Sequence, residues 1–159
     1  GVEPARHFLA NPHYDPGVQT HTVQSLGALA GVRQIDSFVQ LASVAEHDED
    51  AFLYQRIAQM MAGYHRGVAR IDNVGVIHGL PVALSVNRDA LLFVPMDELL
   101  WTQRSSQTAA AFEQIVNPLQ PRRKELWISG HASDQIKREL AARGWTVNEN
   151  ARGRLYDIM

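Results

Sequence analysis

A chain of 159 residues with 45% hydrophobic and 20% charged side chains is typical of one globular domain that folds without disulfides. Its 15 Lys and Arg against 17 Asp and Glu leave a formal net charge of -2, which gives no long-range attraction to nucleic acid or to an anionic membrane. Because cysteine is absent, disulfides, thiolate nucleophiles and zinc fingers are excluded.

Helical patterns dominate the first part of the chain. Asp15, followed directly by a proline, predicts a helix start with Asp15 as the N-cap, and the apolar period after it stops near Gly31. Asp36 and Asp48 are the N-cap candidates of a second and a third helix. Short connections between three such helices predict a helical layer over residues 1-70.

Short runs of β-forming residues follow the third helix. Residues 74–77, 82–86 and 90–94 are separated by turn residues, and this pattern predicts an antiparallel meander. A helix is predicted over residues 106–116, and the proline-rich residues 117–121 end it.

The C-terminal part predicts a strand, a helix and a second strand. Residues 126–128 form the first strand, Ser133 is the N-cap of the helix, and Gly144 takes the left-handed position that ends it. With the second strand at 145–149, this segment is a βαβ unit, in which the two strands run parallel.

These elements predict the fold class α+β, as a single domain over residues 1-159. The helical layer of residues 1-70 is followed, in residues 71-159, by a mixed sheet of about five strands with two helices, to which the meander and the βαβ unit both contribute. No apolar run approaches the roughly 20 residues of a membrane-spanning helix. Because the chain begins with Gly1 rather than Met, we expect it to be part of a longer or processed protein.

The loop that enters the C-terminal helix is the strongest candidate for a binding site. Such a loop presents free backbone N–H groups and the positive end of a helix dipole, and Gly130 lets an anion approach the backbone closely. Ser129, His131 and Ser133 supply further hydrogen-bond donors, so these four residues are the predicted ligand-binding residues. The structural alternative is that Gly130 only makes the turn, Ser133 only caps the helix and His131 is simply exposed.

No catalytic residue, metal site or cofactor is predicted. The acidic run 46–50 has no glycine-centred calcium loop and is better explained by carboxylates at the start of a helix. The seven histidines include no His-x-x-x-His pair, and no Gly-x-Ser-x-Gly motif provides a serine nucleophile. Ser129 and His131 cannot be called a triad without an acidic residue that orients the histidine.

Two further groups allow binding of a larger partner. Arg104 and the basic run 122–124, with two tryptophans nearby, have the composition of a weak single-stranded nucleic-acid binder, although a solvated turn explains the run better. Met60 and Met61, with Tyr54 and Tyr64 at helical spacing, are expected in the core, or as the lining of a hydrophobic groove if the helical layer splays from the sheet.

We therefore predict a non-catalytic binding or interaction domain whose partner is a protein or a small anionic ligand. The absence of cysteine and of an initial Met favours a bacterial exported protein, periplasmic or in the cell envelope, over a cytoplasmic one. The alternatives are a small hydrolase or transferase with an anion-binding corner at Ser129–Ser133, and a weak nucleic-acid binder. An open apolar groove would favour the binding domain, whereas a cleft in which His131 meets a second polar group would favour the enzyme.

Overall fold

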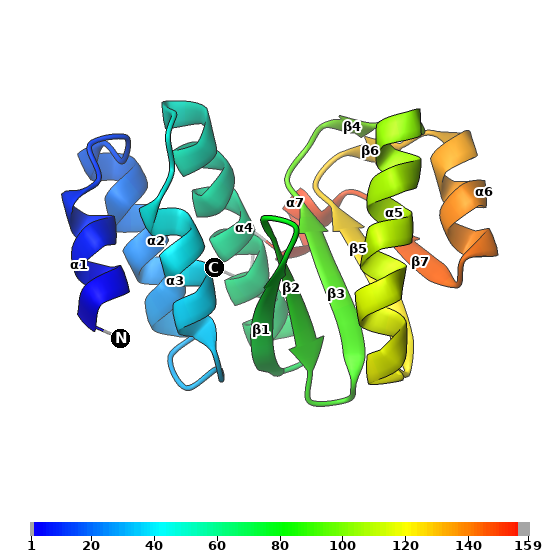
Figure 1. The fold of residues 1–159 in the computed structure, drawn as a ribbon, viewed down its shortest axis with the longest axis horizontal. Coiled ribbons are helices and arrows are strands. Elements are labelled where there is room, and N and C mark those ends of the chain that lie inside the picture. The colour runs from blue at the N-terminus through cyan, green and yellow to red at the C-terminus, as the bar shows by residue number, and fades with distance from the viewer. Residues whose placement is uncertain (1, 156–159) are drawn as a thin grey trace.

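In the computed structural model, which describes residues 2–155, N-terminal helices are stacked beside a sheet that has helices on both faces (Figure 1). The first four elements are α1 (Val2–Ala10), α2 (Pro16–Ala28), α3 (Ile35–Ser43) and α4 (Asp48–Gly67). The middle of the chain forms β1 (Ile71–Ile77), β2 (Leu80–Ser85), β3 (Asp89–Val94), β4 (Glu98–Leu99), α5 (Gln103–Val116) and the 3-10 turn η1 (Asn117–Leu119). The last elements are β5 (Arg123–Ile128), β6 (His131–Ala132), α6 (Asp134–Ala142), β7 (Trp145–Asn148) and α7 (Ala151–Leu155).

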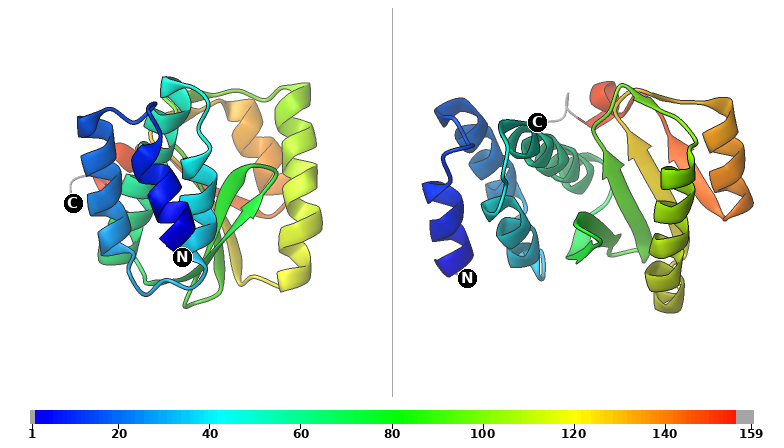
Figure 2. Two further views of the ribbon diagram at one scale, coloured as in Figure 1. Left: turned by 60° about the vertical axis from the view of Figure 1, so that its left-hand side comes forward. Right: turned by 45° about the horizontal axis from the view of Figure 1, so that its top comes forward.

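The helical layer contains α1 in addition to the three predicted helices. α1 lies on the outside of the layer, and α4 lies between the other N-terminal helices and the sheet (Figure 2). Among the described side chains of α1 only Phe8 is buried, where its ring contacts the edge of Tyr14 at 4.5 Å between centroids. A helix held by one apolar anchor gives no apolar period, and for this reason the sequence did not reveal it.

The predicted helix starts have different outcomes. Asp15 is the N-cap of α2, and its carboxylate accepts the N–H of Val18 at 2.8 Å, as predicted. The predictions for Asp36 and Asp48 are wrong by one or two positions, because Gln34 and His47 are the N-caps and both aspartates lie inside the first turns. There the negative charges still interact favourably with the helix dipoles.

The predicted end of α2 is also displaced. α2 ends at Ala28, three residues before Gly31, which has a φ of 90° in the turn that follows. Gly31 therefore belongs to the connection and does not stop the helix itself.

The five-stranded sheet has the order β1-β2-β3-β5-β7 and is mixed, which confirms the predicted fold class. The predicted meander is present, because β1–β2 and β2–β3 pair antiparallel. β5 and β7 pair parallel and are joined by α6, which confirms the C-terminal βαβ unit. A second crossover, in which α5 connects the parallel strands β3 and β5, was not predicted, because periodicity within a strand carries no information about its neighbour.

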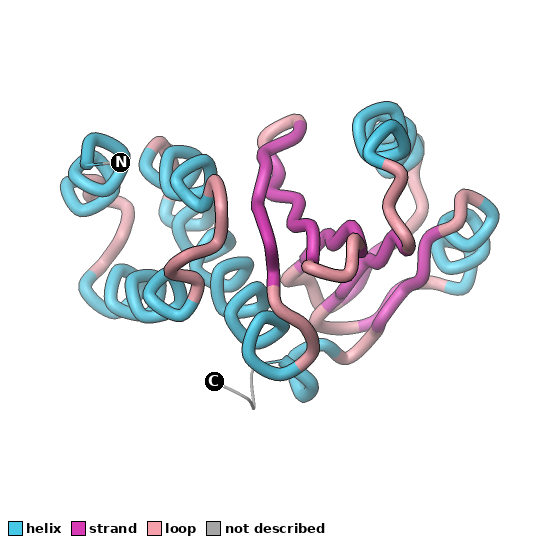
Figure 3. The backbone as a smooth tube through the Cα atoms, turned by 90° about the horizontal axis from the view of Figure 1, so that it is seen from below, coloured by secondary structure: helices cyan, strands magenta, loops and turns pink. Residues whose placement is uncertain are grey.

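Alternating side chains of the sheet separate two buried clusters. Leu91, Phe93 and Trp127 face α4 and α7, whereas Leu126 and Ile128 face α5 and α6. Figure 3 shows α5 and α6 on one side of the sheet and α4 on the other. The sheet is thus covered on both faces, as expected for strands in parallel βαβ units.

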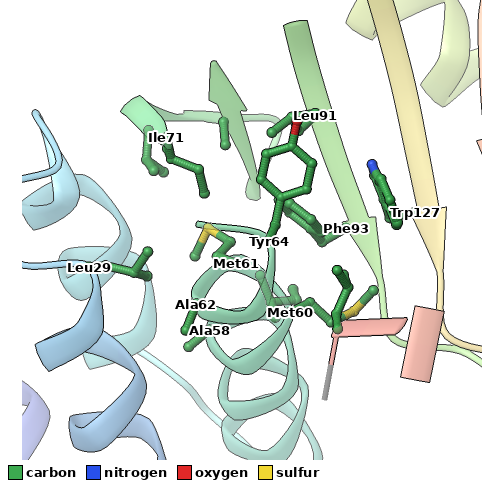
Figure 4. Packing of buried hydrophobic residues seen from close by; sticks show 14 of the residues in the cluster. Leu29, Ala58, Met60, Met61, Ala62, Tyr64, Ile71, Leu91, Phe93 and Trp127 are labelled. Carbon is green, nitrogen blue, oxygen red and sulfur yellow. The ribbon is translucent and has the colours of Figure 1, made fainter. Parts of the chain in front are cut away.

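The packing of α4 on the sheet is aromatic at its centre. The ring of Tyr64 lies 5.9 Å from that of Phe93 and 5.6 Å from that of Trp127, in edge-to-face geometry (Figure 4). Met60 and Met61 have no exposed surface, so they belong to the core and line no open groove. The helical layer does not splay from the sheet at this point, because α4 packs on α2 and on β3 together.

The helix of the βαβ unit, α6, has the predicted ends. The Ser133 hydroxyl accepts the N–H of Ile136 at 3.2 Å, and Gly144 follows the helix with a φ of 84°. No helix within residues 2–155 has both the length and the apolar character needed to cross a membrane.

Candidate functional site

The predicted binding corner at Ser129–Ser133 is closed by a neighbouring segment of the chain. β4 pairs parallel with β6, and the backbone around β4 lies directly against the loop. The N–H groups of residues 129–133 all donate to protein acceptors at 2.8–3.1 Å, namely the carbonyl oxygens of Val94, Met96, Asp97 and Leu99 and the carboxylate of Glu149. The free N–H groups expected for an anion are therefore already occupied.

Gly130 is required in this corner by backbone packing. A Cβ at this position would lie 1.9 Å from the carbonyl oxygen of Asp97. The close approach that the sequence suggested for an anion is thus made by another stretch of the same chain. Ligand binding by the four corner residues stays a prediction, and these contacts lend it no support.

The corner also contains an acidic partner that the sequence did not indicate. The carboxylate of Glu149 accepts the Ala132 N–H at 3.0 Å and the Lys137 ammonium at 3.2 Å, and it lies 3.6 Å from Nδ1 of His131. The backbone hydrogen bond from Ala132 and then the Lys137 charge hold the pKa of Glu149 below its usual range. The hydroxyl of Ser129 is directed elsewhere and donates to the carbonyl of Met96 at 2.9 Å, so these contacts do not form a serine relay.

We expect Glu149→Gln to lower the free energy of unfolding by up to about 1 kcal/mol at neutral pH, because the charged acceptor of two hydrogen bonds is lost. A lowered pKa in the folded state stabilises the protein above the usual carboxyl value of 4.5, and this stabilisation is lost as the pH falls below it. Urea unfolding at neutral pH and near pH 3 measures the difference, which should shrink at the lower pH. A difference that grows on acidification would contradict the assignment.

A buried polar cluster lies at the opposite end of β5, under α4. The carboxylate of Asp89 accepts two hydrogen bonds from Arg122, at 3.0 and 2.8 Å, and Glu125 accepts the indole N–H of Trp127 at 2.9 Å. Burial, with the nearby carboxylates of Glu125 and Asp89, raises the pKa of Tyr64 to about 12. Because both carboxylates accept hydrogen bonds within the protein, we interpret the cluster as structural.

Two of the three basic side chains in the run 122–124 are bound to other residues of the protein. Arg122 binds Asp89, and the ammonium of Lys124 donates to the carbonyl of Arg143 at 2.7 Å. Trp127 is buried on the face of the sheet that packs against α4. These contacts give no support to the nucleic-acid alternative.

Side chains of the types that bind metals do not form a cluster in the described part of the chain. Among residues 2–155 no group of three or more His, Asp or Glu converges in the way a metal ion requires.

A cavity of about 870 Å³ opens where β2 and β3 stop pairing. The two strands pair from Leu84–Ala90 to Val82–Leu92, and the same register carried one residue further would place Pro81 opposite Phe93. Proline has no N–H to donate to the ladder, so the pairing of these strands ends there. Pro81 pairs instead with β1.

The wall of the cavity is mainly apolar. Its side toward α5 and α6 is formed by Phe112, Leu126, Ile136, Leu140 and Trp145. On the side of the helical layer, α4 contributes Leu53 and Ile57. The cavity therefore combines residues from both sides of the sheet, which the gap between β2 and β3 permits.

Large apolar side chains are exposed among the lining residues that follow β3. Met96 is 47% and Leu100 is 60% exposed, although both line the cavity. Trp145, in contrast, is buried, and its indole N–H is one of three buried polar side-chain groups without a hydrogen-bond partner in residues 2–155. Exposed apolar residues beside a mainly apolar cavity are typical of a ligand-binding site.

The cavity was not predicted from the sequence, although two features of the sequence are related to it. Pro81 ends the pairing of a strand, and the run Leu99-Leu100-Trp101 is strongly apolar for a connection between a strand and a helix. Neither signal indicates which segments meet, because the cavity joins the β1–β2 turn, the end of β3, α5 and α6.

Comparisons of this chain with protein-family models, with curated proteins and with solved structures found no match. Its function therefore has to be argued from the cavity itself.

Proposed function

We propose that this chain is a non-catalytic binding domain that holds an apolar or amphipathic small molecule in the cavity between β2, β3 and α5. The observation that carries the proposal is the cavity of about 870 Å³, with its apolar wall and the exposed Met96 and Leu100. Its size is in the range of known small-molecule sites. Covering apolar side chains that otherwise face water provides the driving force for binding.

The hydrolase or transferase alternative has weaker support. His131 does meet an acidic group, Glu149, but its own side chain is 68% exposed and the N–H groups around it are occupied. The expected location in a bacterial envelope stays a prediction.

The proposal is tested with a neutral dye that fluoresces in apolar sites, N-phenyl-naphthylamine. We expect saturable binding with a dissociation constant in the micromolar range. Ala109→Phe should abolish it, because Ala109 lines the cavity and the added ring fills it. Ala110→Phe is the matched control, since Ala110 is exposed on the same helix and is not part of the lining.

Far-UV circular dichroism and thermal melts establish that both variants fold. Saturable binding that Ala109→Phe removes and Ala110→Phe preserves would support the cavity as the binding site. Equal binding by the two variants, or no saturable binding by the unchanged protein, would overturn the proposal.

A further inference from the structure

We propose that the ligand of this cavity is a single-chain amphiphile with one carboxylate, such as a free fatty acid. The acid group would lie at Arg104 and His78, and the alkyl chain would lie along the apolar wall toward Trp145. This inference rests on the proposed function and adds the chemical class of the ligand.

The charges of the lining residues carry the inference. Arg104 and His78 are its ionisable side chains, and no Asp or Glu takes part in the lining. A carboxylate would therefore meet positive charge without a competing negative one, whereas a cationic ligand would meet repulsion and find no counter-ion.

Both side chains are placed to meet a head group at the surface. His78 and Arg104 are exposed, His78 in the turn between β1 and β2 and Arg104 at the start of α5. Within residues 2–155 the guanidinium of Arg104 and the imidazole of His78 have no ion pair or hydrogen bond. Both groups can thus bind an anion without first losing a partner in the described part of the protein.

The position of Arg104 is unfavourable for the helix alone. The first turn of a helix prefers negative charge, and α4 follows this rule with Asp48, Glu49 and Asp50. The first turn of α5 has no acidic residue and includes Arg104. A carboxylate bound beside this turn would supply the negative charge that the sequence of α5 lacks.

The rest of the lining suits an alkyl chain. Phe112, Leu126, Ile136 and Leu140 provide an apolar surface beyond the charged residues, and Met96 and Leu100 would be covered by the bound molecule. Charge at one place and a long apolar wall elsewhere are complementary to an amphiphile.

The test compares decanoate with decanol, which have the same chain and differ in the charge of the head group. Binding is measured by displacement of the neutral dye, below the micelle concentration of each. We expect the unchanged protein to bind decanoate about fivefold more tightly than decanol at low salt. Arg104→Gln should remove this preference and leave the affinity for decanol unchanged.

Arg123→Gln is the matched control, because it removes the same charge from an exposed site that does not line the cavity. Equal affinity of the unchanged protein for decanoate and decanol would overturn the inference while leaving the proposed function standing. A loss of the decanoate preference in Arg123→Gln as large as in Arg104→Gln would also overturn it. Failure of the dye and of both amphiphiles to bind would instead remove the proposed function.

Vesicles test whether the site binds a membrane surface instead of a free acid. Sedimentation with vesicles of an anionic phospholipid, free of fatty acid, should leave the protein in the supernatant. Cosedimentation that Arg104→Gln abolishes would overturn the free acid as the ligand and assign the site to a membrane surface.

Discussion

Gly130→Ala is expected to lower the free energy of unfolding by about 3 kcal/mol. The new Cβ would lie 1.9 Å from the carbonyl oxygen and 2.4 Å from the carbonyl carbon of Asp97, so one of the two backbone segments has to move. This movement breaks the hydrogen bonds from Gly130 to Met96 and from His131 to Asp97, each worth about 1 kcal/mol, and adds the cost of overpacking. Urea denaturation at neutral pH measures the loss.

Gly27→Ala is the matched control for this substitution. Gly27 lies in α2, and a Cβ there meets no atom within 4 Å. The higher helix propensity of alanine should raise stability by about 0.5 kcal/mol. A loss of less than about 1 kcal/mol in Gly130→Ala would contradict the close packing of Asp97 on the loop.

Gly130→Ala also tests whether the corner supports the wall of the cavity. Met96 and Leu99 accept hydrogen bonds from the loop, and both line the cavity. A displacement of this segment should therefore weaken dye binding in the folded fraction of Gly130→Ala. The corner that the sequence predicted as a ligand site would then contribute to binding by supporting the cavity wall.

Gly63→Ala is expected to lower stability by about 2 kcal/mol, because α4 and α7 meet at this residue. A Cβ on Gly63 would lie 2.2 Å from the carbonyl oxygen of Leu155. Alanine gains about 1 kcal/mol in helix propensity, but displacement of α7 exposes Leu155 and Ala151, which are both fully buried. The lost burial and packing exceed the gain in propensity.

A double-mutant cycle with Leu155→Ala separates the two effects. Leu155→Ala alone should cost about 2–4 kcal/mol, since it removes a buried side chain without a clash. If Gly63→Ala already displaces α7, the double variant should be clearly more stable than the sum of the single losses predicts. Strict additivity would mean that α7 stays in place and that the overlap is relieved elsewhere.

Several local features followed from the sequence because the interacting groups lie within four residues of each other. Asp15 and Ser133 cap their helices through side chains that reach N–H groups three residues ahead. Gly144 ends α6 because the left-handed conformation favours glycine. The strands of the meander followed in the same way from runs of β-forming residues between turns.

The closed corner at residues 129–133, by contrast, depends on contacts between segments that are distant in the sequence. The N–H groups of residues 129–133 are free in any local description of the loop, and only the return of residues 94–99 against them fills their hydrogen-bonding capacity. β4 and β6 are two residues long, too short to have a period of their own. The sequence could indicate that Gly130 permits a close approach, but it could not indicate what approaches.

The cavity shows the same division. The apolar strands and the helix of residues 134–142 with both of its ends could be predicted, because they depend on periodicity and on groups a few residues apart. In contrast, the end of the β2–β3 pairing beside Pro81 and the residues of α4, α5 and α6 that line the cavity depend on how distant segments pack. The packing of distant segments also buries Met60 and Met61 and makes Arg104 and the β1–β2 turn part of the lining of one cavity.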